Sequence, residues 1–392
     1  MVAPVVTAQQ LRGILEAPAR AHRIDMVGVL NLPRPLTHAP DFLSWLREGR
    51  HGGLDYMSRD PEARLDPTRE RDWASSLLVF AQRYADGWRP DDAEAREGCR
   101  ADRPWTAGVS RYARGDDYHD VLRRSIRRLI QVLRETLSAR GVLRAEGDLR
   151  SEDAVDAGPY LEREYAWLAG LGFYGKNTLL IHPRLGSALF LGVAVTNLRI
   201  TGLAEAPRPL LGPPVARAPE GEGPATLCGT CTLCLDACPT DALARPFALD
   251  ANQCLSTWSI EWRGGAPADR RRDQGGLLFG CDICQQVCPW NHKAARLAAG
   301  ALPEAYVVSP AHGALDLADL IRMDADAFRD RFRHTPLWRA HPEGLRRNAL
   351  VVAANTGRRD IVEVVRAAAE GDPDAGVREV ARWALAELEG AR

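Results

Sequence analysis

Eight of the nine cysteines in this chain lie in two runs that each end in a Cys-Pro pair, and the second run opens with the more distant Cys254. Apart from Cys254, gaps of two and three residues separate the cysteines of each run. Such gaps let a short loop aim thiolates at different irons of one cube, and the cysteine before proline typically reaches the neighbouring cluster. The pattern therefore predicts two 4Fe-4S clusters, one held by Cys228, Cys231, Cys234 and Cys288, and the other by Cys238, Cys254, Cys281 and Cys284.

Disulfides and zinc are the alternative uses of these cysteines. Disulfides are disfavoured because no apolar signal segment opens the sequence, and eight cysteines in this order misfit the paired knuckles of zinc sites. Cys99 lies in a charged segment far from the two runs, and we expect it to be an incidental free thiol.

The length of 392 residues predicts two to three domains. A formal net charge of -1, with arginine replacing most lysine, neither favours nor excludes a nucleic-acid partner. No stretch of about twenty apolar residues exists, and no export leader is recognised, so we expect a cytoplasmic protein without a membrane segment.

The first two hundred residues alternate helical and strand-like patterns, which predicts an α/β or α+β domain. Thr7 is expected to cap a helix that runs towards His22. Strands are expected over 25–30, over 75–80, just before Asp156 and within 188–195, and a helix over 162–168.

The longest helical pattern runs from about Asp117 to Arg140, and Gly141 is the expected stop. Its second face is rich in arginine, which is typical of a solvated helix face, with RNA contact as the less favoured alternative. That face carries Arg123, Arg124, Arg127, Arg128 and Arg134.

The overall fold class we predict is α+β, in three units and a linker. Residues 1–207 are expected to form the N-terminal domain, the proline- and glycine-rich residues 208–224 a linker, and residues 225–300 a bacterial ferredoxin-like module. Residues 301–392 read as helix pairs that resemble HEAT-type repeats. A local excess of arginine between 322 and 347 makes a phosphate-binding surface plausible there.

A pure electron carrier needs only the middle module, so the flanking units indicate an enzyme in which the clusters feed a second redox cofactor. The sequence has no P-loop, no G-x-G-x-x-G motif after a strand and no H-E-x-x-H helix. Nucleotide-binding and zinc-hydrolase functions are therefore poorly supported.

Several motifs in order along the chain resemble the epoxyqueuosine reductase family. The cysteine pattern and the helical C-terminal unit fit the same family. The motifs are at 51–57, 110–119, 155–163, 170–177 and 279–285.

This resemblance implies a cobalamin-dependent enzyme that reduces epoxyqueuosine to queuosine in tRNA, with cobalamin in the N-terminal domain and electrons from a low-potential donor. It implies that Asp156 is the proton donor. It further implies that residues near the corrin or the substrate are Arg64, Ser110, Lys176, Asn177, Ser256, Asp282 and Ile283.

An acid that protonates the departing epoxide oxygen has to be neutral near pH 7, which requires burial and few cationic neighbours. The alternative for Asp156 is a capping role, because it stands just before a helix and aspartate is a common N-cap.

Three other positions have open alternatives. His119 is expected to be a structural or helix-start residue rather than a cobalt ligand, and Lys176 either binds a phosphate or amide group or is an ordinary surface lysine. Trp258, Trp262 and Trp290 either shield the clusters or belong to the core.

The nearest rival function is that of a reductive dehalogenase, which pairs the same two kinds of cofactor but usually carries an export leader and lacks a helical tail. An electron-transfer or RNA-binding adaptor without catalysis is a further alternative. We expect a monomer, because an anticodon stem needs free access to the site.

Overall fold

A four-stranded sheet in the order β2-β3-β7-β4 organises the N-terminal half, and each neighbouring pair is antiparallel. All four strands were expected from the sequence. The N-terminal unit is therefore α+β, which is the second of the two classes that its sequence allowed. The strands are β2 (Met26–Asn31), β3 (Ser76–Arg83), β7 (Leu189–Thr196) and β4 (Ser151–Ala154).

This architecture comes from a computed structural model that describes residues 3–89, 108–144, 148–215, 227–297, 300–308 and 316–390. Cys99 lies outside these ranges. Among the helices within them, none has both the length and the apolar character required to cross a bilayer.

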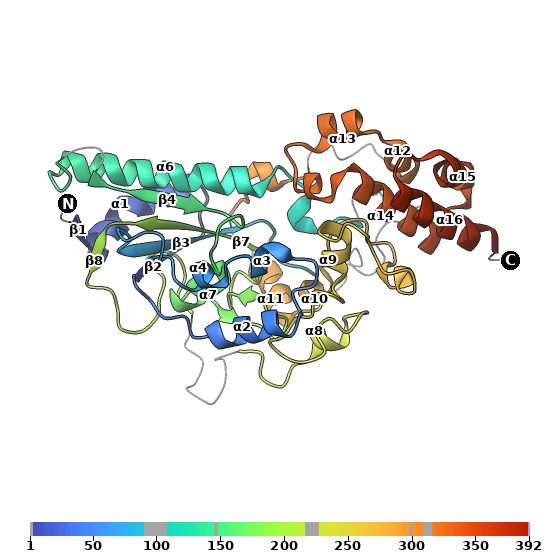
Figure 1. Ribbon diagram of the computed structural model, residues 1–392. Coiled ribbons are helices and arrows are strands. Elements are labelled where there is room, and N and C mark those ends of the chain that lie inside the picture. The colour runs from blue at the N-terminus through green and yellow to red at the C-terminus, as the bar shows by residue number, and fades with distance from the viewer. Residues whose placement is uncertain are drawn as a thin grey trace.

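Helices cover both faces of the sheet. Helices α1 (Ala8–Ala21) and α6 (Tyr118–Ala139) pack on one face, where α6 runs the length of the sheet (Figure 1). Helix α7 (Glu162–Leu168) packs on the other face. Every residue of β3 is buried, as a strand with two covered faces requires.

Local signals at the helix ends act as the sequence predicted. Thr7 and Gln10 form a reciprocal capping box at the start of α1. After α6, Gly141 adopts a φ of +69°, which a glycine tolerates without steric strain.

Smaller elements complete the N-terminal unit. A parallel pair joins β1 to β8, and an antiparallel pair joins β5 to β6. These elements are β1 (Val5–Thr7), α2 (Ala39–Arg47), α3 (Asp55–Ser58), α4 (Pro61–Leu65), η2 (Arg111–Ala113), β5 (Phe173–Tyr174), β6 (Leu180–Ile181) and β8 (Arg199–Thr201).

Part of the expected linker packs against the sheet. Leu210 and Leu211 are buried, and Leu211 exchanges two backbone hydrogen bonds with Val27 of β2, at 3.0 and 3.1 Å. Residues 216–224 of the expected linker lie outside the described residues. The first linker residues therefore extend the edge of the sheet beside β2.

The cysteine module consists of short helices joined by loops. It packs against the N-terminal unit, because Cys288 contacts Phe173 and Ile181, and Phe279 forms a β-bridge with Val109. Its elements are α8 (Leu233–Asp236), α9 (Leu255–Ile260), η4 (Arg271–Gln274), α10 (Ile283–Gln286) and α11 (Pro289–Leu297).

From Glu304 onwards the described chain is helical, as expected, and forms the far end of the molecule (Figure 1). Helix α14 is central, since it packs against α12, α16 and the loops around α9. The elements are η5 (Glu304–Tyr306), α12 (Leu317–Arg322), α13 (Ala325–Phe332), η7 (Pro336–Ala340), α14 (His341–Asn355), η8 (Arg359–Ile361), α15 (Val362–Gly371) and α16 (Ala375–Gly390).

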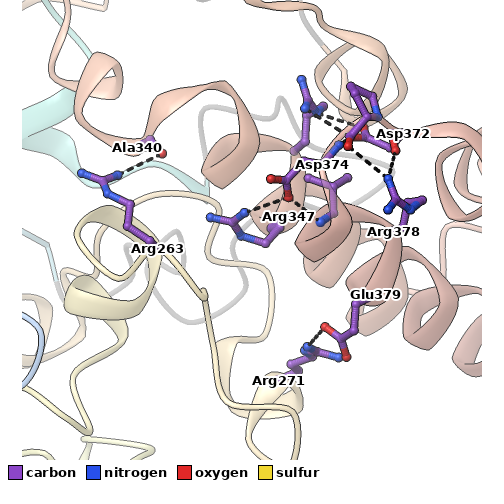
Figure 2. A network of polar contacts seen from close by, with 11 residues as sticks. Arg263, Arg271, Ala340, Arg347, Asp372, Asp374, Arg378 and Glu379 are labelled. Carbon is purple, nitrogen blue, oxygen red and sulfur yellow. Dashed lines mark hydrogen bonds and ion pairs between the residues drawn. The ribbon is translucent and has the colours of Figure 1, made fainter.

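Two arginines of the expected phosphate-binding surface are buried instead. Arg346 pairs with Asp372 at 3.1 Å, and Arg347 pairs with Asp374 at 3.4 Å. Figure 2 shows Arg347 and Asp374 beside Asp372 and Arg378 at the loop between α15 and α16. These two arginines fasten the helical unit together and do not face solvent.

Candidate active site and cluster-binding region

Four cysteines from both runs line one cavity of about 230 Å³. They are the four that the sequence assigned to the first cluster, and Lys176, Asn177 and Trp290 line the same cavity. Burial raises the pKa of the Cys234 thiol to about 11, and the other three thiols raise it further. The cysteines are Cys228, Cys231, Cys234 and Cys288.

The loops of this cavity are held from the N-terminal unit. Lys176 Nζ donates hydrogen bonds to the carbonyls of Gly229 at 2.7 Å and Cys231 at 2.9 Å. Asn177 is buried, and its Nδ2 lies 3.5 Å from the carbonyl of Cys284. Lys176 is therefore not an ordinary surface lysine, because its ammonium holds the first cysteine loop in place.

The remaining four cysteines of the two runs form a second group. Burial raises the pKa of Cys281, and the neighbouring thiols of Cys254 and Cys238 raise it further. The pKa of Cys284 is raised well above its ordinary value by burial and by Cys281, Cys254 and Cys234. Because Cys234 belongs to the first group, the two groups lie side by side.

Each group has the chemistry of a multi-iron site. Buried thiols that raise one another's pKa ionise together only when cations compensate their charge. The cavity of about 230 Å³ at the first group suits a cluster of several atoms, since sulfur ligands lie only about 2.3 Å from a zinc ion.

The tryptophans near the cysteines take two kinds of position. Trp258 is 1% exposed and packs with Leu255, and Trp262 lies against the same small core. Trp290 lines the first cavity and contacts the Phe173 ring edge to face. Trp258 and Trp262 therefore belong to the core, whereas a shielding role for Trp290 stays a prediction.

Asp156 follows β4 in a loop and does not cap a helix. The N-cap of α7 is Leu161, without a side-chain capping bond. Asp156 has a φ of +54°, an uncommon value for a residue with a side chain, and its carboxyl is 64% exposed. The capping alternative is wrong, and the burial that an acid role requires is not supplied by the chain alone.

Two residues at the start of α6 face this carboxyl. The Tyr118 hydroxyl donates a hydrogen bond to Asp156 Oδ2, and His119 Nε2 lies 3.8 Å from the same oxygen. Asp117 caps α6 and accepts from the His119 backbone N–H, while its Oδ1 lies 2.7 Å from His119 Nδ1. His119 is thus a helix-start residue, as expected, and its Nε2 atom points to Asp156.

Residues from all three units surround Asp156. Burial raises the pKa of Tyr56 to about 12, and the negative charges of Glu261 and Asp156 add to that effect. Arg339, from the helical unit, binds Glu261 with two nitrogens and lies 5.7 Å from the Tyr56 ring centre. Arg64 donates to the carbonyls of Tyr56 at 2.7 Å and Gly158 at 3.3 Å, which ties α4 to the Asp156 loop.

Ser110 and Asp282 lie where the N-terminal unit meets the cysteine module. Ser110 is buried against Gly280, where an added Cβ would come within 2.3 Å of the serine hydroxyl. Asp282 is buried and accepts from the Arg111 backbone N–H at 2.8 Å. Burial raises the pKa of Asp282, although that hydrogen bond opposes the shift.

The other two expected contacts belong to the module itself. Ser256 is half-buried in α9, and Ile283 packs against the core that contains Trp258. The structure therefore gathers Arg64 and Asp156 on one side, and Ser110, Ser256, Asp282 and Ile283 near the second cysteine group.

Sequence reasoning missed the aromatic residues of this site. Tyr112 is half-buried, and its pKa is raised well above its ordinary value by desolvation and by the nearby acids Asp156, Asp282 and Glu261. Tyr118 is buried and holds Asp156. Both stand within the 110–119 motif, which was the available signal, but their contacts depend on the tertiary fold.

Two family models match the chain. One is described as a "4Fe-4S double cluster binding domain" and matches residues 227–291. The other is described as "Epoxyqueuosine reductase QueG, DUF1730" and matches residues 64–145.

Curated relatives match nearly the whole chain. The epoxyqueuosine reductase of Pseudomonas aeruginosa is 33% identical over 89% of this chain and 86% of the relative. The chain belongs to the epoxyqueuosine reductase family. The Alicycliphilus denitrificans enzyme is 31% identical over 98% of this chain and 99% of its own length.

Solved epoxyqueuosine reductases share the fold. One structure with a tyrosine-tRNA stem loop that carries epoxyqueuosine has a TM-score of 0.79 and 26% identity, over 97% of this chain and 91% of that chain. The Bacillus subtilis enzyme, solved with an aspartate catalytic loop swung out of the active site, matches with the same score, identity and coverage. The chain thus has the double-cluster domain and the architecture of this reductase family.

Proposed function

We propose that this epoxyqueuosine reductase family member reduces epoxyqueuosine to queuosine in a tRNA anticodon stem loop, with Asp156 as the acid. The observation that supports this most directly is the Asp156 carboxyl, which is exposed on an uncommon backbone conformation and held by Tyr118. The Bacillus subtilis relative has an aspartate on a catalytic loop, which supports the same role for this loop.

Tyr118 orients the acid. Burial raises the pKa of Tyr118 well above its ordinary value, so its hydroxyl stays protonated and donates to Asp156 Oδ2. Within the described residues, Oδ1 of Asp156 accepts no hydrogen bond, so this oxygen is available to hold the transferable proton. Bound substrate and cofactor would displace water from the carboxyl, which favours its neutral form.

One observation fits a large group bound beside Asp156, because the described residues leave 64% of this side chain uncovered. We assign this place to cobalamin, with Arg64, Ser110, Ser256, Asp282 and Ile283 as the residues around it. When bound, cobalamin supplies a strong reductant and nucleophile for the epoxide carbon.

For the clusters, we propose the two cysteine groups as ligand sets. Four thiols line one cavity and four others are mutually adjacent, which supports this division. Cys234 lies near enough to Cys284 to raise its pKa, which supports electron transfer from one cluster to the other. A low-potential protein or chemical donor would supply the electrons.

We propose that the C-terminal helices contact tRNA and that they form a HEAT-like unit over residues 301–392. The proposed limits of the other parts are 1–207 for the N-terminal domain, 208–224 for the linker and 225–300 for the cysteine module. A stem loop bound to a relative of the same fold supports this partner. The exposed arginines Arg322, Arg329, Arg333 and Arg339 remain available to phosphates, although Arg329 and Arg339 also pair with acids. Arg339 has the most direct position, because it lies beside Tyr56 at the Asp156 site.

The test is anaerobic incubation of the reconstituted protein with cobalamin, a low-potential reductant and epoxyqueuosine-containing tRNA, followed by nucleoside mass spectrometry. We expect queuosine with the native protein and at least about a hundredfold less with Asp156→Asn, because the amide cannot donate the proton. Asp153→Asn, on β4 but paired with Arg127, is the matched control. Normal turnover by Asp156→Asn would refute the acid role.

A further inference from the structure

A second carboxyl lies at the opposite end of the Asp156 loop. Glu162 is the first residue of α7, and among the described residues its Oε1 has less than 1 Å² of accessible surface and no hydrogen-bond partner. A carboxylate oxygen buried without a partner is costly, whereas a neutral carboxylic acid is tolerated. The geometry therefore favours a protonated Glu162.

The charges that face Glu162 come from the loop, from α7 and from α4. Burial raises the pKa of Glu162 to about 8, and the charge of Asp156 raises it further, while the backbone N–H of Glu162 itself, Arg163 and Arg64 oppose the shift. Both arginines also donate to backbone carbonyls, Arg163 to Thr178 and Arg64 to Tyr56 and Gly158. The remaining titratable neighbours, Tyr160 and Tyr165, both have raised pKa values and stay neutral.

The reaction requires more protons than Asp156 holds. Reducing an epoxide to an alkene breaks both carbon–oxygen bonds, forms the carbon–carbon double bond and releases the oxygen as water. This balance consumes two electrons, which the donor supplies through the clusters, and two protons. One carboxyl carries one proton, so Asp156 has to be protonated again before the hydroxyl can leave as water.

We propose that Glu162 is the residue that returns the second proton to Asp156 during each turnover. Asp156 first protonates the departing oxygen and becomes a carboxylate. The Glu162 carboxyl then transfers its proton to Asp156 through bound water, and Asp156 protonates the hydroxyl. Two protons from solvent reload both acids. Glu162 acts through Asp156, so it is a positioning and proton-supplying residue, and this inference rests on the proposed role of Asp156.

The kinetic test uses Glu162→Gln, which keeps the side-chain shape but holds no transferable proton. We expect kcat to fall by about tenfold or more with KM for the tRNA unchanged, because the change affects proton supply and not binding. In the native enzyme, kcat should fall as pH rises through about 8, and this alkaline limb should disappear in the variant. Glu62→Gln is the matched control, since Glu62 on α4 is 71% exposed.

A second readout is independent of turnover. Infrared difference spectra of the native protein, recorded between pH 6 and pH 10, should show a neutral carboxyl band that disappears near pH 8. Glu162→Gln should lack this band, and Glu62→Gln should retain it.

These outcomes separate the inference from the proposed function. If the native enzyme makes queuosine but Glu162→Gln has the native pH profile, or the native protein lacks the carboxyl band, the inference is overturned. If the band is present and is lost in Glu162→Gln but the native enzyme makes no queuosine, the proposed function fails instead. The band of the native protein is informative even if the variant does not fold.

Discussion

At the scale of single residues, His38 and Glu164 form a buried charged pair on the sheet face opposite α6. His38 Nδ1 lies 2.7 Å from Glu164 Oε2, and the Tyr174 hydroxyl donates to the same oxygen at 3.1 Å. The hydrogen bond to Glu164 raises the pKa of His38. Burial alone would raise the pKa of Glu164, but the bonds from His38 outweigh it and hold the pKa below its ordinary range.

These shifts give a pH-dependent contribution to stability. A histidine with a raised pKa stabilises the fold below its ordinary value of 6.5, and this is lost as pH rises through the folded-state pKa. A glutamate with a lowered pKa stabilises above 4.5, and this is lost as pH falls through the folded-state pKa. The pair therefore contributes most between about pH 4.5 and 6.5.

We expect His38→Asn to reduce the free energy of unfolding by about 1 to 3 kcal/mol at pH 6, and by less at pH 8.5. Thermal unfolding followed by circular dichroism at the two pH values measures the difference. Glu48→Gln is the control, because its partner Arg50 and the pair itself lie at the surface. An equal loss at both pH values would show that only packing, and not charge, is affected.

At the scale of elements, α14 depends on a buried arginine. Arg346 and Asp372 are each only 7% exposed, and Arg346 Nη1 also donates to the Met323 carbonyl at 3.0 Å. These contacts join α14 to the end of α12 and to the loop between α15 and α16. Figure 2 shows Asp372 in this network, where it also accepts, through its carbonyl, from Arg378.

We expect Asp372→Ala to destabilise the helical unit by about 3 to 5 kcal/mol, because it leaves the Arg346 charge buried and unpaired. Asp326→Ala is the matched control, since its bond to Arg329 is exposed and is worth about 0.5 kcal/mol at most. Limited proteolysis and thermal unfolding measure both variants. A similarly small loss of stability in both variants would mean that water hydrates the Arg346 guanidinium in the folded state.

The elements themselves could be predicted where the signal is local. The Thr7 capping box, the apolar stripe of α6 and the apolar run of β3 each define an element from neighbouring residues. The antiparallel order of the sheet and the docking of Leu211 beside Val27 could not be predicted, because strand partners are distant in sequence. The burial of Arg346 could not be predicted either, since arginine side chains are usually exposed to solvent.

At the scale of the whole molecule, the cysteine groups could be predicted from local sequence signals, whereas the Asp156 site depends on long-range packing. The cysteines could be grouped from their spacing, and the structure brings the expected four together at one cavity. The surroundings of Asp156 could not be predicted from the sequence, because Tyr56, Glu261 and Arg339 come from three different units. The spacing of residues within one loop can be read directly from the sequence, whereas a site between units depends on how those units pack.

The division of the cysteines predicts that either group can lose its cluster separately. Cys231→Ala removes a thiol from the first group and Cys254→Ala one from the second, so we expect each variant to retain about half of the native iron. Because Cys234 and Cys284 bring the groups together, native reduced protein should show magnetic coupling between the clusters in electron paramagnetic resonance spectra. Each variant should show the spectrum of one isolated cluster. Cys99→Ser, outside both runs, should keep full iron and the coupled spectrum, and full iron in Cys231→Ala or Cys254→Ala would refute the ligand assignment.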